Sequence, residues 1–163
     1  MMSAMQDVHL LEQIDQLRPV LLPFLFRCGV AAFCGAMVGL EREVKQKPAG
    51  FRTNILICVG AAIYTAVGAL LFQGANGVDL TRIAAQVVVG IGFLGAGSII
   101  QNGGQVTGLT TAATIWVVAG IGVVAGAGFP LLALISSGMV LLTLVILAPI
   151  EERLFKHPEH PRE

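Results

Sequence analysis

Long apolar runs alternate with short polar breaks along the whole chain. The pattern predicts five membrane-spanning helices, at roughly 20–40, 53–72, 83–100, 110–124 and 130–149. The breaks at 41–50, 73–79, 101–105 and 126–130 are charged or rich in turn-forming residues, and the one at 101–105 is expected to be a polar hairpin. A β-barrel is disfavoured because its strands would alternate apolar and polar side chains. The fourth segment is the shortest, and with the fifth it could instead form a buried hairpin.

Composition supports a protein whose solvent is lipid. Of 163 residues, 55% are hydrophobic and 12% are charged, and the mean hydropathy is +0.81. Soluble domains usually carry about 25% charged residues, and the stretch 83–150 holds no Asp, Glu, Lys, Arg or His. We therefore expect an all-α membrane protein: an amphipathic segment at 1–19, a transmembrane domain of about five helices at 20–150, and a short tail at 151–163.

The basic residues predict how the chain lies across the membrane. With five spans, the N-terminus and the connection at 73–82 share one side, which carries Arg18 and Arg82. The other side receives seven basic residues, which are Arg42, Lys45, Lys47, Arg52, Arg153, Lys156 and Arg162. Since cytoplasmic loops are enriched in Lys and Arg, we expect the C-terminus in the cytoplasm and the N-terminus outside.

Residues 90–97, GIGFLGAG, contain the G-x-G-x-x-G pattern of a dinucleotide-binding turn. That interpretation needs an acidic residue about 20 positions further on, whereas the first acid after Asp79 is Glu151. Small residues also let helices approach closely within a membrane. We therefore predict helix packing at Gly35, Gly39, Gly90, Gly92, Gly95, Gly97, Gly122 and Gly126. A broken helix whose carbonyls line an ion path is the alternative for 90–97.

Polar side chains near the ends of the predicted spans form the candidate site. Its members are Glu41, Arg42, Glu43, Arg52, Asn54, Gln86, Thr110 and Thr111. Charges within hydrocarbon need partners, so we expect either Glu41 to pair with Arg52 or Arg42 to pair with neighbours of Glu43. Gln86 is expected to hydrogen-bond to another helix. The simpler interpretation is interfacial anchoring and helix capping, with Thr53 or Thr110 as an N-cap.

No metal, cofactor or catalytic constellation is predicted. Glu41 and Glu43 meet the minimum of one or two carboxylates for Mg²⁺, but at i and i+2 they point apart on a helix. The tail motif HPEH at 157–160 is better explained as solvated chain than as a metal site. Cys28, Cys34 and Cys58 lie in apolar segments without a histidine to activate them. An enzyme is disfavoured, and so is nucleic-acid binding, because the formal net charge is zero.

Five motifs carry a resemblance to a known family. They are GLERE at 39–43, AGFRTN at 49–54, TRIAAQ at 81–86, GIGFLGAG at 90–97 and GLTTAATIW at 108–116. In this order, over about 23–150, the chain resembles the MgtC/SapB/YhiD family of bacterial inner-membrane proteins. The resemblance implies a small helical membrane domain, roles in low-magnesium, acid or intramacrophage stress, and often a soluble domain after the last span. This chain is expected to be the membrane module without that domain.

Two functions of different class follow. The first is a non-catalytic regulator that associates through its helices with itself, as a dimer, and with membrane complexes; the resemblance suggests ATP synthase or a stress-related transporter. The second is a small ion or solute transporter or channel, magnesium included, with Glu41, Arg42, Arg52 and Gln86 along its path. Besides lipid, no further partner is predicted.

Overall fold

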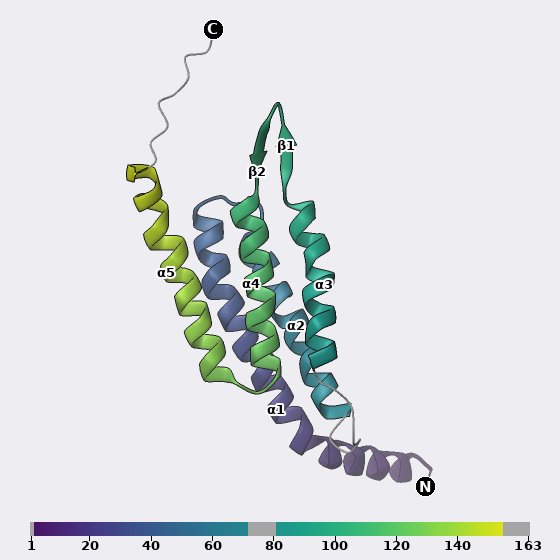
Figure 1. Cartoon of the computed structure of the whole chain (residues 1–163). Coiled ribbons are helices and arrows are strands. Elements are labelled where there is room, and N and C mark those ends of the chain that lie inside the picture. The colour runs from purple at the N-terminus through teal and green to yellow at the C-terminus, as the bar shows by residue number, and fades with distance from the viewer. Residues whose placement is uncertain (1, 72–80, 155–163) are drawn as a thin grey trace.

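The computed structural model describes residues 2–71 and 81–154, and it is a bundle of five helices with one short hairpin (Figure 1). This confirms the predicted all-α membrane fold. The helices and strands, in chain order, are α1 (Met2–Val44), α2 (Phe51–Leu71), α3 (Thr81–Gly97), β1 (Ile100–Asn102), β2 (Gln105–Thr107), α4 (Leu109–Gly126) and α5 (Pro130–Leu154).

Four of the described helices are long and apolar enough to cross a membrane. Their spanning parts are Arg18–Val44, Phe51–Ala69, Leu109–Gly126 and Pro130–Ile150. The shortest helix is α3, with 17 residues, which corresponds to about 26 Å at 1.5 Å per residue. The fourth segment was therefore the wrong one to single out as short. The third segment, predicted over 83–100, ends as a helix at Gly97, because the chain then enters the hairpin. The fourth segment is longer than predicted, since α4 begins at Leu109 and ends at Gly126.

The first helix has no break at the boundary predicted between 19 and 20. It runs from Met2 to Val44 with Pro19 and Pro23 inside it. The side chains of 1–17, which carry the predicted amphipathic face, lie outside the described residues. The same holds for the connection at 72–80 with Asp79, and for the tail from 155 with its HPEH motif.

Two glycine pairs bring α1 and α4 against the backbone of α2. A Cβ added at Gly35 would lie 2.7 Å from the carbonyl oxygen of Asn54, and one at Gly39 would lie 2.9 Å from the Cα of Phe51. From the other side, a Cβ at Gly122 would collide with the carbonyl oxygen of Cys58, and one at Gly126 would lie 2.8 Å from the Cα of Ala62. The pairs Gly35/Gly39 and Gly122/Gly126, whose members are four residues apart, thus serve contacts within the chain.

The glycines of α3 behave differently. A Cβ at Gly90, Gly92 or Gly97 would meet no atom within 4 Å, and one at Gly95 would lie 3.7 Å from the carbonyl oxygen of Ala112. Within the chain, therefore, the expected packing is found only at Gly95. Figure 1 shows why: α3 stands at one side of the bundle and α5 at the other, so much of α3 has no helix beside it. Because 81–97 is a single helix, the dinucleotide-turn interpretation of GIGFLGAG is excluded.

The polar break after α3 is a two-stranded antiparallel hairpin. Asn102 pairs with Gln105 across Gly103 and Gly104, whose φ angles are 56° and 87°. Two consecutive positive φ angles define the tight turn that matches strand twist, and glycine adopts them without a steric penalty. The predicted hairpin at 101–105 is confirmed, and its two strands extend it to Ile100 on one side and Thr107 on the other.

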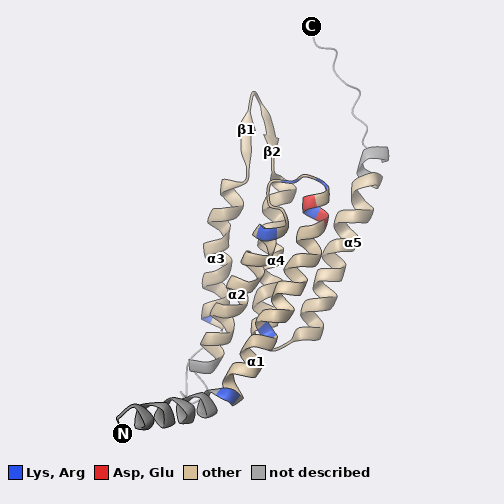
Figure 2. Ribbon diagram, turned by 180° about the vertical axis from the view of Figure 1, so that it is seen from behind, with Lys and Arg blue, Asp and Glu red and all other residues tan. Residues whose placement is uncertain are grey.

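Charged residues gather at the two ends of the bundle, and both acids drawn in Figure 2 lie toward the end that bears the hairpin. At the opposite end, Arg27 of α1 donates from Nη1 to the carbonyl oxygen of Gly126 at 3.1 Å. This carbonyl belongs to the last turn of α4, where the helix dipole favours a cation. Arg27 therefore links α1 to α4, and the Gly126 carbonyl oxygen is the hydrogen-bond partner of its membrane-embedded charge.

Candidate functional site

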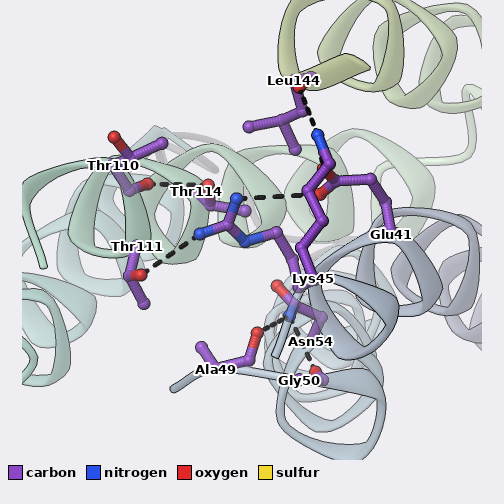
Figure 3. Close-up of polar contacts among 10 residues, drawn as sticks. Glu41, Lys45, Ala49, Gly50, Asn54, Thr110, Thr111, Thr114 and Leu144 are labelled. Atoms are coloured by element: carbon purple, nitrogen blue, oxygen red, sulfur yellow. Dashed lines mark hydrogen bonds and ion pairs between the residues drawn. The ribbon is translucent and has the colours of Figure 1, made fainter. Parts of the chain in front are cut away.

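The hairpin end of the bundle contains a compact group of charged and polar side chains centred on α1 (Figure 3). The carboxylate of Glu41 lies 2.8 Å from Lys45 Nζ and 3.7 Å from Arg42 Nη1. The Glu41 side chain is only 8% exposed, so these two cations offset the cost of holding its charge away from water. Lys45 also donates to the carbonyl oxygen of Leu144 on α5, at 3.0 Å.

Arg42 is the most deeply buried charge of the group, with its side chain 3% exposed. It reaches from α1 to α4, where Nη2 donates to Thr111 Oγ1 at 3.2 Å. Its Nε has no hydrogen-bond partner among the described residues. A buried donor left unpaired costs about 1–3 kcal/mol, so this guanidinium retains one unused hydrogen-bonding direction.

Glu43 and Asn54 fix the sharp connection between α1 and α2. Glu43 Oε2 accepts a hydrogen bond from the backbone N–H of Phe51, at 2.8 Å, which satisfies one of the free donors at the start of α2. Asn54 is fully buried, and its Nδ2 donates to the carbonyl oxygens of Ala49 and Gly50, both at 2.8 Å. These two side chains hold the turn and the helix start in place.

The remaining predicted members lie apart from this group. Arg52 is exposed and pairs with no described residue, so the expected Glu41–Arg52 pair is wrong. Lys45 takes that place because, at i+4 from Glu41, it already lies on the same helix face. Gln86 is exposed on α3 and donates to no other helix in the described structure, contrary to expectation.

The expected N-caps are also wrong. The N-cap of α4 is Gly108, with φ 90°, and it makes no side-chain capping bond. Thr110 is the second residue of that helix, and its carbonyl oxygen accepts from Thr114 Oγ1 at 2.7 Å. At α2, the acceptor for the first N–H is Glu43 and not Thr53.

Two cavities flank the bundle, and they share no lining residue. The first, of about 750 Å³, lies between α2 and α3 and is lined mostly by apolar groups, with Arg82 and Gln86 among them. The second, of about 970 Å³, lies at the hairpin end, where Arg42, Lys45 and Thr111 line it. We call the first the α2–α3 groove and the second the basic cavity.

Three residues escaped the sequence analysis of the site. Lys45 joins Glu41 to α5, Lys47 lines the basic cavity, and Thr143 lines it from α5. The i, i+4 spacing of Glu41 and Lys45 could have revealed the first. Nothing in the local sequence places Thr143 near residue 42, because that proximity is a property of the bundle.

The two candidate magnesium ligands point to different partners. Glu41 faces Lys45 and Arg42, whereas Glu43 faces the start of α2. Among the side chains that the structure describes, no group of three or more His, Cys, Asp or Glu is arranged to hold a metal ion. The three cysteines are free thiols, with Cys34 and Cys58 buried in the core.

Comparisons with known proteins place this architecture in one family. The family profile described as "MgtC family" matches residues 28–153. The chain is 41% identical over 142 residues to "Putative magnesium transporter YhiD" of Escherichia coli K12, covering 84% of this chain and 66% of that protein. It is 40% identical over 141 residues to "Protein MgtC" of Salmonella typhimurium LT2, covering 86% of this chain and 59% of that protein.

A cyanobacterial relative gives the same result. "Uncharacterized protein slr0014" of Synechocystis is 40% identical over 139 residues, covering 85% of this chain and 58% of that protein. The matched region thus spans less than two thirds of each of these relatives. No solved structure matches the chain.

Proposed function

This chain belongs to the MgtC family of membrane proteins, and from that premise we propose that it is a non-catalytic regulator of the bacterial inner membrane. It acts by lateral association of its helices with a second copy and with other membrane complexes. The observation that carries this proposal is that α3 is open on more than one side: Gly90 and Gly97 lie on one face and Gly92 on another, and a Cβ at any of them would meet no atom of the chain within 4 Å.

Helices in lipid associate under different forces from those that act in water. Apolar side chains gain little by leaving lipid for a protein surface, so association depends on close packing at small residues and on polar contacts. The spaces at Gly35, Gly39, Gly122 and Gly126 are already filled by α2, whereas Gly90, Gly92 and Gly97 on α3 leave room for another helix. The exposed amide of Gln86 lies on the same helix, beside the α2–α3 groove, and offers a hydrogen bond to an incoming neighbour.

The second candidate, a small transporter, is favoured by one observation, which is that a relative is named a putative magnesium transporter. The geometry gives it less support. Glu41 and Glu43 are engaged by Lys45, Arg42 and the start of α2, so neither carboxylate is free to bind a passing cation. The two cavities described also share no lining residue that would join them into one path.

Association and transport are separated by measuring both on the same purified protein. We expect crosslinking of single-cysteine α3 variants in native membranes to capture a second copy or a partner complex, with ATP synthase as the first to test. Gly92→Leu should abolish this crosslink, because the leucine fills the space that the neighbour needs. The matched control is Gly138→Leu on α5, another position where a Cβ meets nothing within 4 Å, and it should leave the crosslink intact.

The transport arm uses proteoliposomes with an internal Mg²⁺ indicator and a panel of other cations. The regulator proposal expects no flux above empty liposomes. Flux that falls on Glu41→Gln or Arg52→Gln, together with an α3 crosslink unaffected by Gly92→Leu, would establish the transporter instead.

A further inference from the structure

We propose that the basic cavity at the hairpin end is a binding site for a phosphate group. Its walls come from the end of α1 and the turn after it, the start of α4, the base of the hairpin, and the stretch of α5 around Leu144. At about 970 Å³, the cavity is large enough for a phosphate with its organic substituent.

The charge of the cavity selects an anion. Arg42, Lys45 and Lys47 line it, and no Asp or Glu is among its described lining residues. Glu41 lies behind Lys45 and Arg42 and balances one of the three charges. The remaining excess of positive charge repels Mg²⁺ and attracts phosphate.

Arg42 supplies the observation that points to a ligand. Its side chain is 3% exposed and lines the cavity, yet its Nε is buried without a partner. A guanidinium presents several N–H donors in one plane and binds phosphate oxygens with two of them at once. Arg42 therefore places in the wall of the cavity a guanidinium that keeps one N–H unused.

The start of α4 adds neutral donors on the opposite wall. Gly108, Leu109, Thr110 and Thr111 all line the cavity. The first intrahelical bond of α4 runs from the Ala112 N–H to the Gly108 carbonyl oxygen. The N-cap, Gly108, makes no side-chain bond to the N–H groups of the helix residues before Ala112. Free N–H groups and the positive end of the helix dipole make such a terminus a suitable cradle for phosphate.

Two sources supply this chemistry, and the structure favours the lipid one. Leu144 and Leu147 line the cavity from α5, and Leu147 is 55% exposed at the bundle surface. An anionic phospholipid would place its phosphate against the cations and its chains along α5. Free inorganic phosphate is the alternative source, and the experiment separates the two.

The test measures binding to the purified full chain in detergent. Native mass spectrometry compares dioleoyl phosphatidylglycerol with dioleoylglycerol, which has the same chains and no phosphate. A parallel thermal-shift series compares inorganic phosphate with chloride at equal ionic strength. A lipid site retains phosphatidylglycerol over dioleoylglycerol, whereas a site for free phosphate shows a larger shift with phosphate than with chloride and competition between phosphate and lipid.

Lys47 provides the variant that spares the fold, because its side chain is exposed and is joined to no described residue by a hydrogen bond or ion pair. Lys47→Gln should weaken binding about fivefold and the Lys45→Gln, Lys47→Gln pair about twentyfold, with Lys47→Arg restoring the wild-type value. The control is Arg52→Gln, a cation at the same end that does not line the cavity; it should stay within about twofold. Equal retention of the two lipids with no phosphate-specific shift overturns the proposal, and so does a double variant that binds like the wild type.

Discussion

Four glycines on α1 and α4 and three on α3 occur in similar apolar sequences, but their surroundings in the structure differ. At Gly35, Gly39, Gly122 and Gly126, the backbone of α2 occupies the space that a side chain would need. At Gly90, Gly92 and Gly97, that space is open. The comparison teaches that a small-residue motif in a membrane helix reports a capacity for close approach, and that the neighbour can be the same chain or another one.

The largest expected effect is on the free energy of unfolding, at a glycine that α2 packs against. Gly122→Leu should destabilise the fold by at least about 3 kcal/mol, because the added atoms must displace the α2 backbone at Cys58 and not a flexible side chain. Gly92→Leu, in open space on α3, should stay within about 0.5 kcal/mol. Reversible unfolding of both variants in mixed micelles measures the difference. Equal losses of unfolding free energy for the two variants would contradict the contrast between a filled space at Gly122 and an open one at Gly92.

A smaller effect separates two arginines at the hairpin end. Arg42→Met removes a buried cation from Glu41 and Thr111 and should cost about 2–3 kcal/mol, since Lys45 still pairs with Glu41. Arg52→Met removes an exposed cation and should change the unfolding free energy by no more than about 0.5 kcal/mol. The same micelle assay applies, and a costly Arg52→Met would contradict the absence of a partner for Arg52 among the described residues.

The two amides differ for the same reason. Asn54→Ala removes the side-chain donor of the Ala49 carbonyl oxygen, whereas the Gly50 carbonyl oxygen keeps its bond from the residue 54 backbone N–H. The expected cost is about 1–2 kcal/mol. Gln86→Ala removes an exposed amide from α3 and should leave the stability of the isolated chain unchanged. In native membranes, however, Gln86→Ala should weaken the α3 crosslink. An unaltered crosslink would show that the amide takes no part in association.

The smallest expected effect is the change in stability on replacing a glycine by alanine, and its sign differs between α3 and α1. Gly92→Ala should stabilise the isolated chain by about 0.5 kcal/mol, because alanine loses less conformational entropy than glycine on entering a helix. Gly35→Ala should instead destabilise it, since its Cβ would lie 2.7 Å from the Asn54 carbonyl oxygen. Thermal unfolding followed by circular dichroism detects both shifts, and shifts of the same sign would refute the contrast.

The sequence by itself determined the membrane class, the number of helices, the polar hairpin and the family. These features depend on hydropathy, turn residues and short motifs, which are local properties that lipid as solvent makes decisive. Sequence also identified Arg42, Asn54 and Thr111 as members of a polar cluster, because polar side chains are conspicuous beside long apolar runs.

Only the tertiary structure decided which of these residues meet. Arg42 reaches Thr111 across 69 positions of the chain, and Lys45 reaches Leu144 across 99. It also decided that α2 fills the space at the pairs Gly35/Gly39 and Gly122/Gly126, while Gly90, Gly92 and Gly97 of α3 stay open. The physical reason is that spanning a membrane is settled by each helix alone, whereas the partner of a polar or small side chain depends on how helices distant in sequence are placed side by side.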